Sequence, residues 1–158
     1  MVMNMTAIAL LFMLTICAGY QIVTTDSGLK IEYVSSTNEC EIEANNGSIL
    51  NVHYTGSFIN GTKFDSSYDR DEPLKLILGE CPSTLIIGWV EGLQGMCVGE
   101  GRKLIIPPNL GYGNKGKGVI PGNTTLYFDI NLVDMDSNPT PEKLQEIEKK
   151  YNCKPNDS

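Results

Sequence analysis

The sequence predicts an α+β domain, with an antiparallel sheet of about five strands, one short helix on the apolar face of that sheet, and a short C-terminal helix. Three observations predict this fold. Apolar and polar residues alternate over several segments, one central segment instead has helical spacing, and no long helical crossover separates the strands. The 158 residues, among them 16 glycines and 8 prolines, suffice for one turn-rich domain with its own core.

The strands are expected where the alternation would bury one face. The segment 125–133 shows this pattern most clearly, with apolar residues at Leu126, Phe128, Ile130 and Leu132. Three further segments, 29–34, 49–55 and 74–78, alternate in the same way, and a fifth strand is expected at 102–106, which ends in an apolar run.

One central segment follows the helical period instead. Ile86, Trp89 and Leu93 have the spacing of one helix face, which predicts a short amphipathic helix packed on the sheet. Ser83 or Thr84 is available as its N-cap. The glycine-rich loop 107–122 is either simply flexible or a flap at the mouth of a binding site.

Residues 138–158 are expected to form a separate helical tail. Thr140, Pro141 and Glu142 make a helix start with a cap, a proline at the first position and an early acid. A narrow apolar stripe follows at Leu144, Ile147 and Tyr151. We interpret the tail as a short surface helix held by a disulfide, with a partner-binding helix as the alternative.

The first 19 residues are expected to be a cleaved signal peptide. Residues 7–18 are nearly all apolar but too few to span a bilayer, and Cys17 and Gly19 fit the small positions of a cleavage site. The segment lacks Lys and Arg, so an uncleaved anchor and a lipoprotein signal are alternatives. The mature domain would then span residues 20–137, in the endoplasmic reticulum lumen or outside the cell.

The cysteines and sequons agree with a secretory route. Cleavage would leave four cysteines, which allow three disulfide connectivities in an oxidising compartment. These are Cys40, Cys81, Cys97 and Cys153. Asn46, Asn60 and Asn123 lie in N-glycosylation sequons, so the chain is expected to be a glycoprotein if its host modifies them.

Charge and motifs exclude several function classes. A net charge of -7 argues against nucleic-acid binding and stable membrane association. His53 is the single histidine and is expected to be solvated on the polar face of its strand, so neither a zinc site nor a catalytic triad is expected. No cofactor motif is present, and the remaining candidate site is aromatic: Tyr54, Phe64, Trp89, Tyr112 and Phe128, which composition alone would place in a core.

Eight short strings, in order, resemble the FKBP-type peptidyl-prolyl cis–trans isomerases, especially the small secretory-pathway members. They are VHYTG at 52–56, GTKFDSS at 61–67, LG at 78–79, GWVEGL at 88–93, LIIP at 104–107, LGYG at 110–113, IP at 120–121 and LYFD at 126–129. The resemblance implies a sheet wrapped over a short helix. It also implies a disulfide between Cys40 and Cys97, which leaves Cys81 to pair with Cys153.

The resemblance also implies a pocket between helix and sheet that binds proline-containing polypeptides and the macrolides tacrolimus and rapamycin, with no cofactor. Its catalytic residues would be Tyr54, Phe64, Asp65, Trp89, Tyr112 and Phe128. Its further binding residues would be Leu74, Leu76, Leu85, Ile86, Val119 and Ile120. Leu74 departs from the family, which usually has an aromatic residue there, and residues 80–84 form an enlarged segment.

The sequence therefore predicts a monomeric prolyl isomerase that assists the folding of secreted proteins. The alternatives are a chaperone or interaction module that grips prolyl segments without turnover, and an extracellular interaction protein acting through its acidic surface and tail.

Overall fold

The computed structural model describes residues 21–35, 40–80 and 85–153. One antiparallel sheet has the strand order β1-β2-β6-β7-β3-β4, and β5 also pairs with β3. The strands are β1 (Gln21–Thr24), β2 (Lys30–Ser35), β3 (Ile49–Ser57), β4 (Lys63–Ser66), β5 (Leu74–Ile77), β6 (Gly101–Ile106) and β7 (Leu126–Asp136). The predicted antiparallel sheet is confirmed, with seven strands rather than about five.

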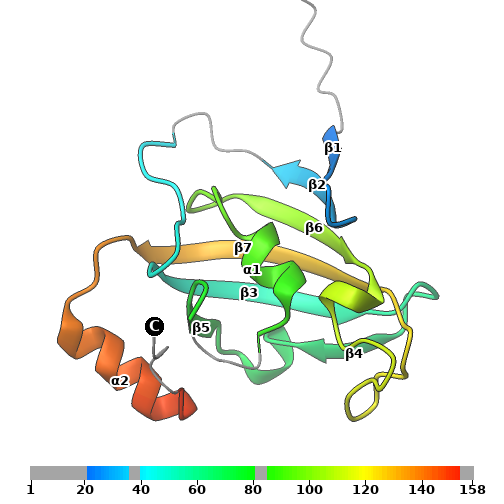
Figure 1. Ribbon diagram of the computed structural model, residues 1–158. Coiled ribbons are helices and arrows are strands. Elements are labelled where there is room, and N and C mark those ends of the chain that lie inside the picture. The colour runs from blue at the N-terminus through cyan, green and yellow to red at the C-terminus, as the bar shows by residue number, and fades with distance from the viewer. Residues whose placement is uncertain (1–20, 36–39, 81–84, 154–158) are drawn as a thin grey trace, which may run out of the picture.

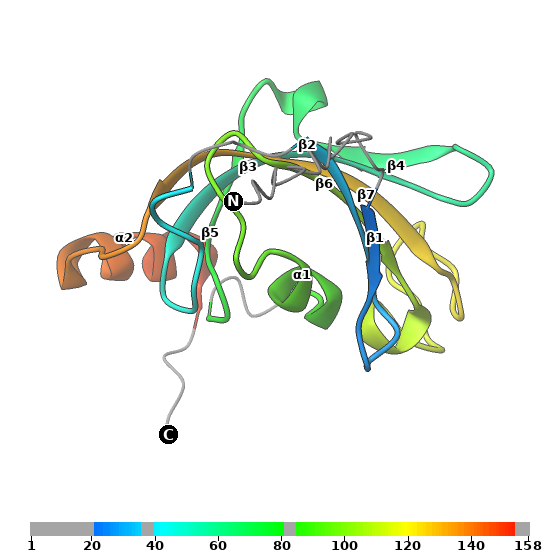
Figure 2. The same cartoon turned by 90° about the horizontal axis from the view of Figure 1, so that it is seen from above.

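The sheet curves around the helix α1 (Ile87–Gly92), which lies in its hollow (Figures 1 and 2). Alternation along the strands directs one set of side chains toward α1. In β7, Leu126, Phe128, Ile130 and Leu132 are all buried, whereas Asp129 between them is exposed. The core therefore fills the space between the sheet and the helix, as the alternation predicted.

Two glycines let α1 approach β6 closely. A Cβ atom on Gly88 would lie 2.5 Å from the side chain of Ile106, and one on Gly92 would lie 2.5 Å from Leu104. The N-cap of α1 is Ile86, without a side-chain capping bond. The predicted cap at position 83 or 84 is therefore wrong, because the helix begins at Ile87; both residues lie outside the described part of the chain.

A buried ion pair fixes the segment that follows α1. Arg102 Nε donates to Glu100 Oε1 at 2.6 Å, and both side chains are at most 7% exposed. The guanidinium also donates, at 2.8–2.9 Å, to the carbonyl oxygens of Gly92, Gln94 and Gly95. Arg102 thus joins β6 to the end of α1, where helix carbonyls lack helical partners.

A second cluster holds the C-terminal helix α2 (Pro141–Tyr151), whose N-cap is Thr140 and whose first residue is a proline, as predicted. Ile147 of α2 is buried together with Ile49 of β3 and Ile77 of β5. Ile77 and its neighbour Leu76 point to opposite faces of the sheet, since successive strand residues alternate. The helix α2 therefore packs on the outer face of the sheet, away from α1.

One predicted disulfide is confirmed; in the other, Cys153 is disulfide-bonded, but its predicted partner is not described. Cys40 and Cys97 are bonded, with a Cα–Cα distance of 5.8 Å. Cys153 packs against the α2 cluster. Its predicted partner, Cys81, lies outside the described residues, as does the predicted signal peptide.

The sequons and the membrane expectation can be placed on the described residues. Asn46, Asn60 and Asn123 are all exposed, on turns or loops, so their glycosylation stays a prediction. Within residues 21–35, 40–80 and 85–153, no helix is long and apolar enough to cross a membrane.

Candidate functional site

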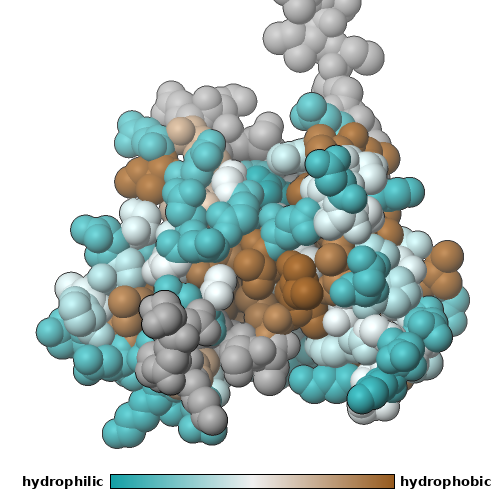
Figure 3. All heavy atoms as spheres, in the orientation of Figure 1, coloured by the Kyte–Doolittle hydropathy of each residue, from teal (hydrophilic) through white to brown (hydrophobic). Residues whose placement is uncertain are grey.

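A cavity of about 570 Å³ opens between α1, the sheet and the loop 107–122. Every predicted site residue except Leu76 lines it. Leu76 is fully buried in the core cluster and is not among the residues that line the cavity. Figure 3 shows hydrophobic side chains gathered near the centre of this face, over α1, with hydrophilic residues around them.

The floor and walls of the cavity are aromatic. Trp89 of α1 is 3% exposed, and the rings of Tyr54 and Phe128 meet it edge-on, with centroids 5.0 and 5.2 Å away. Phe64 meets Phe128 at 88° and 5.6 Å. Edge-to-face contacts at these distances are favourable and hold each ring in one orientation.

Gly56 makes room for this arrangement near the C-terminal end of β3. A Cβ atom at Gly56 would lie 2.7 Å from the ring of Phe64 and 2.8 Å from that of Phe128. Only glycine lets both rings approach the backbone there.

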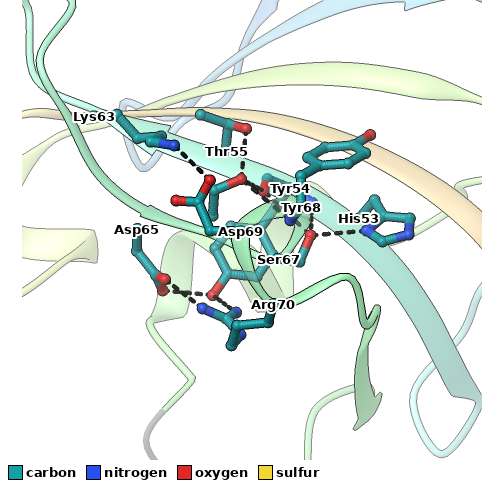
Figure 4. Close-up of polar contacts among 10 residues, drawn as sticks. His53, Tyr54, Thr55, Lys63, Asp65, Ser67, Tyr68, Asp69 and Arg70 are labelled. Carbon is teal, nitrogen blue, oxygen red and sulfur yellow. Dashed lines mark hydrogen bonds and ion pairs between the residues drawn. The ribbon is translucent and has the colours of Figure 1, made fainter.

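The polar edge of the cavity is a three-residue network (Figure 4). The Tyr54 hydroxyl donates to Asp65 Oδ2 at 2.5 Å, and Arg70 Nη1 donates to Asp65 Oδ1 at 2.6 Å. Arg70 Nη2 also donates to the Tyr54 oxygen at 2.8 Å. Each member touches the other two, so the carboxylate has a fixed orientation at the rim.

This network shifts the pKa values of its members. Burial, together with the hydrogen bond and charge of Asp65, raises the pKa of the Tyr54 hydroxyl to about 12, against the opposing effect of Arg70. Burial alone would raise the pKa of the Asp65 carboxyl, but hydrogen bonds from Tyr54 and Arg70 hold it below its ordinary value. Burial, and then the charge of Asp65, raises the pKa of Tyr112. At neutral pH the cavity therefore presents two neutral hydroxyls and one carboxylate.

The sheet edge is interrupted to bring this network together. The strands β4 and β5 pair with successive parts of β3, and the turn η1 (Tyr68–Arg70) lies between them. Ser67 anchors this turn, because the Tyr54 N–H donates to its Oγ at 2.8 Å and its own N–H donates to the Tyr54 carbonyl at 3.1 Å. Arg70 is thereby directed back toward Asp65.

His53 lies on the polar face of β3, as predicted, but it is half-buried rather than solvated. Its ring stacks on Tyr68 at a centroid distance of 4.4 Å, and its Nδ1 lies 2.9 Å from Ser67 Oγ. It therefore packs against the η1 turn instead of facing bulk water.

The loop 107–122 closes the other side of the cavity. It contains the turn η2 (Pro108–Leu110) and a bridge between Lys117 and Ile120. Ile120 is 9% exposed and packs into the core, whereas Val119 is 75% exposed at the mouth. Ile120 thus anchors the loop in the core, whereas the side chain of Val119 is free at the mouth of the cavity.

Four residues near the cavity were not predicted from the sequence. Arg70 completes the polar network, and Lys117, Gly118 and Tyr151 line the cavity itself. Because the glycine-rich loop already indicated a flap, its residues Lys117 and Gly118 could have been predicted to line the cavity. Tyr151 had only its place in the apolar stripe of the tail as a signal.

The curved sheet over a short helix, with an aromatic cavity between them, defines the class of the protein. The model of the FKBP-type peptidyl-prolyl cis-trans isomerases matches residues 40–133. The chain belongs to this family.

Individual relatives agree. Over 100 residues the chain is 50% identical to FK506-binding protein 2 of Dictyostelium discoideum, covering 63% of this chain and 74% of that one. It is 46% identical over 113 residues to FK506-binding protein 2B of Rhizopus delemar, covering 70% and 53%. The crystal structure of FkpA from Escherichia coli superposes with a TM-score of 0.66 at 37% identity, covering 75% and 53%. The chain thus spans about half the length of the last two proteins.

Proposed function

We propose that this domain accelerates cis–trans isomerisation of X-Pro bonds during the folding of secreted proteins, and that tacrolimus and rapamycin bind in the same cavity. The observation that carries the proposal is the floor of the cavity. The indole ring of Trp89 is planar, nearly inaccessible to water and surrounded by aromatic rings that meet it edge-on. A prolyl ring can pack against such a surface.

The apolar walls give a physical route to catalysis. Isomerisation must twist a planar amide, with a barrier of about 20 kcal/mol. The twist removes the resonance that places charge on the oxygen. The twisted amide therefore loses less hydration free energy than the planar amide when it leaves water. A dry cavity therefore favours the transition state over the ground state.

Two polar groups are placed to orient the peptide. The Ile86 N–H precedes the first turn of α1 and has no acceptor among the described residues. The Tyr112 hydroxyl, neutral at physiological pH, lines the opposite side of the cavity. We assign each of them to one substrate carbonyl, so that the prolyl bond lies between them over Trp89.

The test is a proline-peptide isomerase assay with and without tacrolimus. We expect acceleration by the wild type, inhibition by tacrolimus, and a loss of kcat/KM of at least about 10-fold in Trp89→Ala. Tyr112→Phe keeps the ring and should lose only the contribution of one hydrogen bond, about 5-fold. The exposed Val133→Ala on β7 is the control and should match the wild type.

Absence of acceleration by the folded wild type would overturn the proposal. If proline-containing peptides then still bound, the domain would be a prolyl-segment-binding module instead.

We also propose that the chain is processed in the secretory pathway, with residues 1–19 removed and residues 138–158 kept as a tail. The Cys40–Cys97 disulfide supports this location, since such bonds persist in oxidising compartments. Mass spectrometry of the protein secreted by producing cells tests it. A mature chain beginning at Tyr20 is expected, and a chain that retains Met1 would contradict the proposal.

A further inference from the structure

The C-terminal helix contributes a residue to the cavity from outside the family segment. The family match ends at residue 133, whereas α2 begins at Pro141. Tyr151, the last residue of α2, lines the cavity together with Leu74 and Leu85. Part of the cavity wall therefore comes from an element that this match does not include.

The position of Tyr151 follows from how α2 docks. Ile147, 5% exposed, packs with Ile49 and Ile77 on the outer face of the sheet, and Tyr151 packs against the same cluster one turn later. The strand β5 has only β3 as a partner among the described strands, so it forms an edge. Figures 1 and 2 both show α2 beside β5. Tyr151, which belongs to both the outer cluster and the cavity lining, is where the helix passes this edge.

Further contacts hold the last turn of α2 at the rim. Lys150 Nζ lies 3.7 Å from Glu72 Oε1, just before β5, and 5.4 Å from the centroid of the Tyr151 ring. The ion pair is exposed and contributes little energy. The ammonium lies over the Tyr151 ring, but it is the packing of the buried Ile147, rather than this exposed contact, that fixes the helix.

The three side chains make an apolar surface on the β5 side of the cavity, which we call the tail subsite (Leu74, Leu85 and Tyr151). The loop 107–122 lies on the opposite side of α1 from β5 and α2 (Figures 1 and 2). A peptide whose proline lies on Trp89 would place a neighbouring side chain against the tail subsite. An aromatic wall favours an apolar or aromatic side chain there, because such a group gains contact area without leaving a polar atom unpaired.

We propose that Tyr151 is a specificity-determining residue, through which the tail helix strengthens the selection of an apolar or aromatic residue next to the substrate proline. The proposal rests on the proposed isomerase function, since it takes the prolyl ring to lie on Trp89. It adds a role for the tail, because α2 lies outside the residues of the family match.

The experiment measures kcat/KM for peptides carrying Phe, Leu, Ala or Glu, first before and then after the proline. In Tyr151→Ala we expect values for the Phe and Leu peptides to fall about 3- to 10-fold at one of these positions, with the Ala peptides changed less than about 2-fold. Tyr151→Phe keeps the ring and should retain the wild-type preference. Lys150→Ala removes the neighbouring cation and should change each value less than about 2-fold.

The outcomes separate this inference from the proposed function. Thermal unfolding of each variant confirms that it is folded. Equal losses for all peptides in Tyr151→Ala would indicate a structural effect and overturn the inference, as would no loss for any of them. If the wild type itself shows no acceleration, the proposed function fails, and titration calorimetry of the same peptides with wild type and Tyr151→Ala then decides whether the tail subsite selects its ligand.

Discussion

Asp65 is the one carboxylate among the described residues that line the cavity, and it is held between a phenol and a guanidinium. This arrangement keeps an anion at the rim of an otherwise apolar site. Tyr54 acts at the same time as a wall, through its ring against Trp89, and as a donor to Asp65. A change at either residue therefore alters both the shape and the charge of the cavity.

The lowered pKa of Asp65 makes stability depend on acidity. A carboxyl with a folded-state pKa below its ordinary 3.8 stabilises the fold above that pH, and the contribution is lost as the pH falls through the folded-state value. We expect Asp65→Asn to lose less unfolding free energy than the wild type on acidification from pH 5 toward the folded-state pKa. Denaturant unfolding at a series of pH values measures this difference.

Arg70 supplies the control for this prediction. Arg70→Met removes the cation that helps to keep Asp65 ionised, so its acid profile should move toward that of Asp65→Asn. Parallel profiles for the wild type and Asp65→Asn would show that Asp65 does not contribute in this way.

At the scale of elements, the alternation predicted β2, β3, β5, β6 and β7 well, because one face of each packs on the core. It missed β1, all four of whose residues are exposed, and β4, which is only four residues long. β1 has no buried face, and β4 turns only Phe64 and the polar Ser66 inward, which is too little to leave an apolar alternation in the sequence. These strands form by pairing with a neighbour, which is a tertiary property.

The site was predicted only in part, because the positions of some of its residues also depend on tertiary packing. The aromatic residues predicted from the matched strings line the cavity, but Leu76 is buried in the core and does not. Tyr151 could not be predicted as a wall residue, because its place depends on α2 docking beside β5. Arg70 likewise reaches Asp65 only because Ser67 anchors the η1 turn on β3.

The junction between α1 and β6 depends on the buried Arg102–Glu100 pair. Arg102→Ala leaves Glu100 and the carbonyls at the end of α1 without their donor, and should cost about 3–5 kcal/mol of unfolding free energy. Lys103→Ala, the adjacent control, removes only an exposed pair with Asp129 at 3.4 Å and should cost about 1 kcal/mol or less. Denaturant unfolding measures both, and equal costs would contradict the assignment.

At the scale of the whole molecule, the Cys40–Cys97 bond closes a loop with a sequence separation of 57 residues. That loop contains β3, β4, β5 and α1, and so half of the residues that line the cavity. The bond therefore ties the start of this unit to the turn that leads into β6.

Removing this bond should destabilise the protein without changing the cavity. For a loop of this length the lost constraint on the unfolded chain corresponds to about 4 kcal/mol, so the double variant Cys40→Ser/Cys97→Ser should lose about 2–4 kcal/mol in denaturant unfolding. Under strongly native conditions its kcat/KM should stay near that of the wild type. A loss of activity in the folded double variant would show that the bond also shapes the cavity.

Trp89 is the only tryptophan in the 158 residues, and it forms the cavity floor with its indole Nε1 buried and without an acceptor among the described residues. All indole fluorescence of the chain therefore originates at one place, the floor of the cavity. The protein carries its own optical probe, whose emission reports the occupancy of the cavity free of any contribution from a second indole.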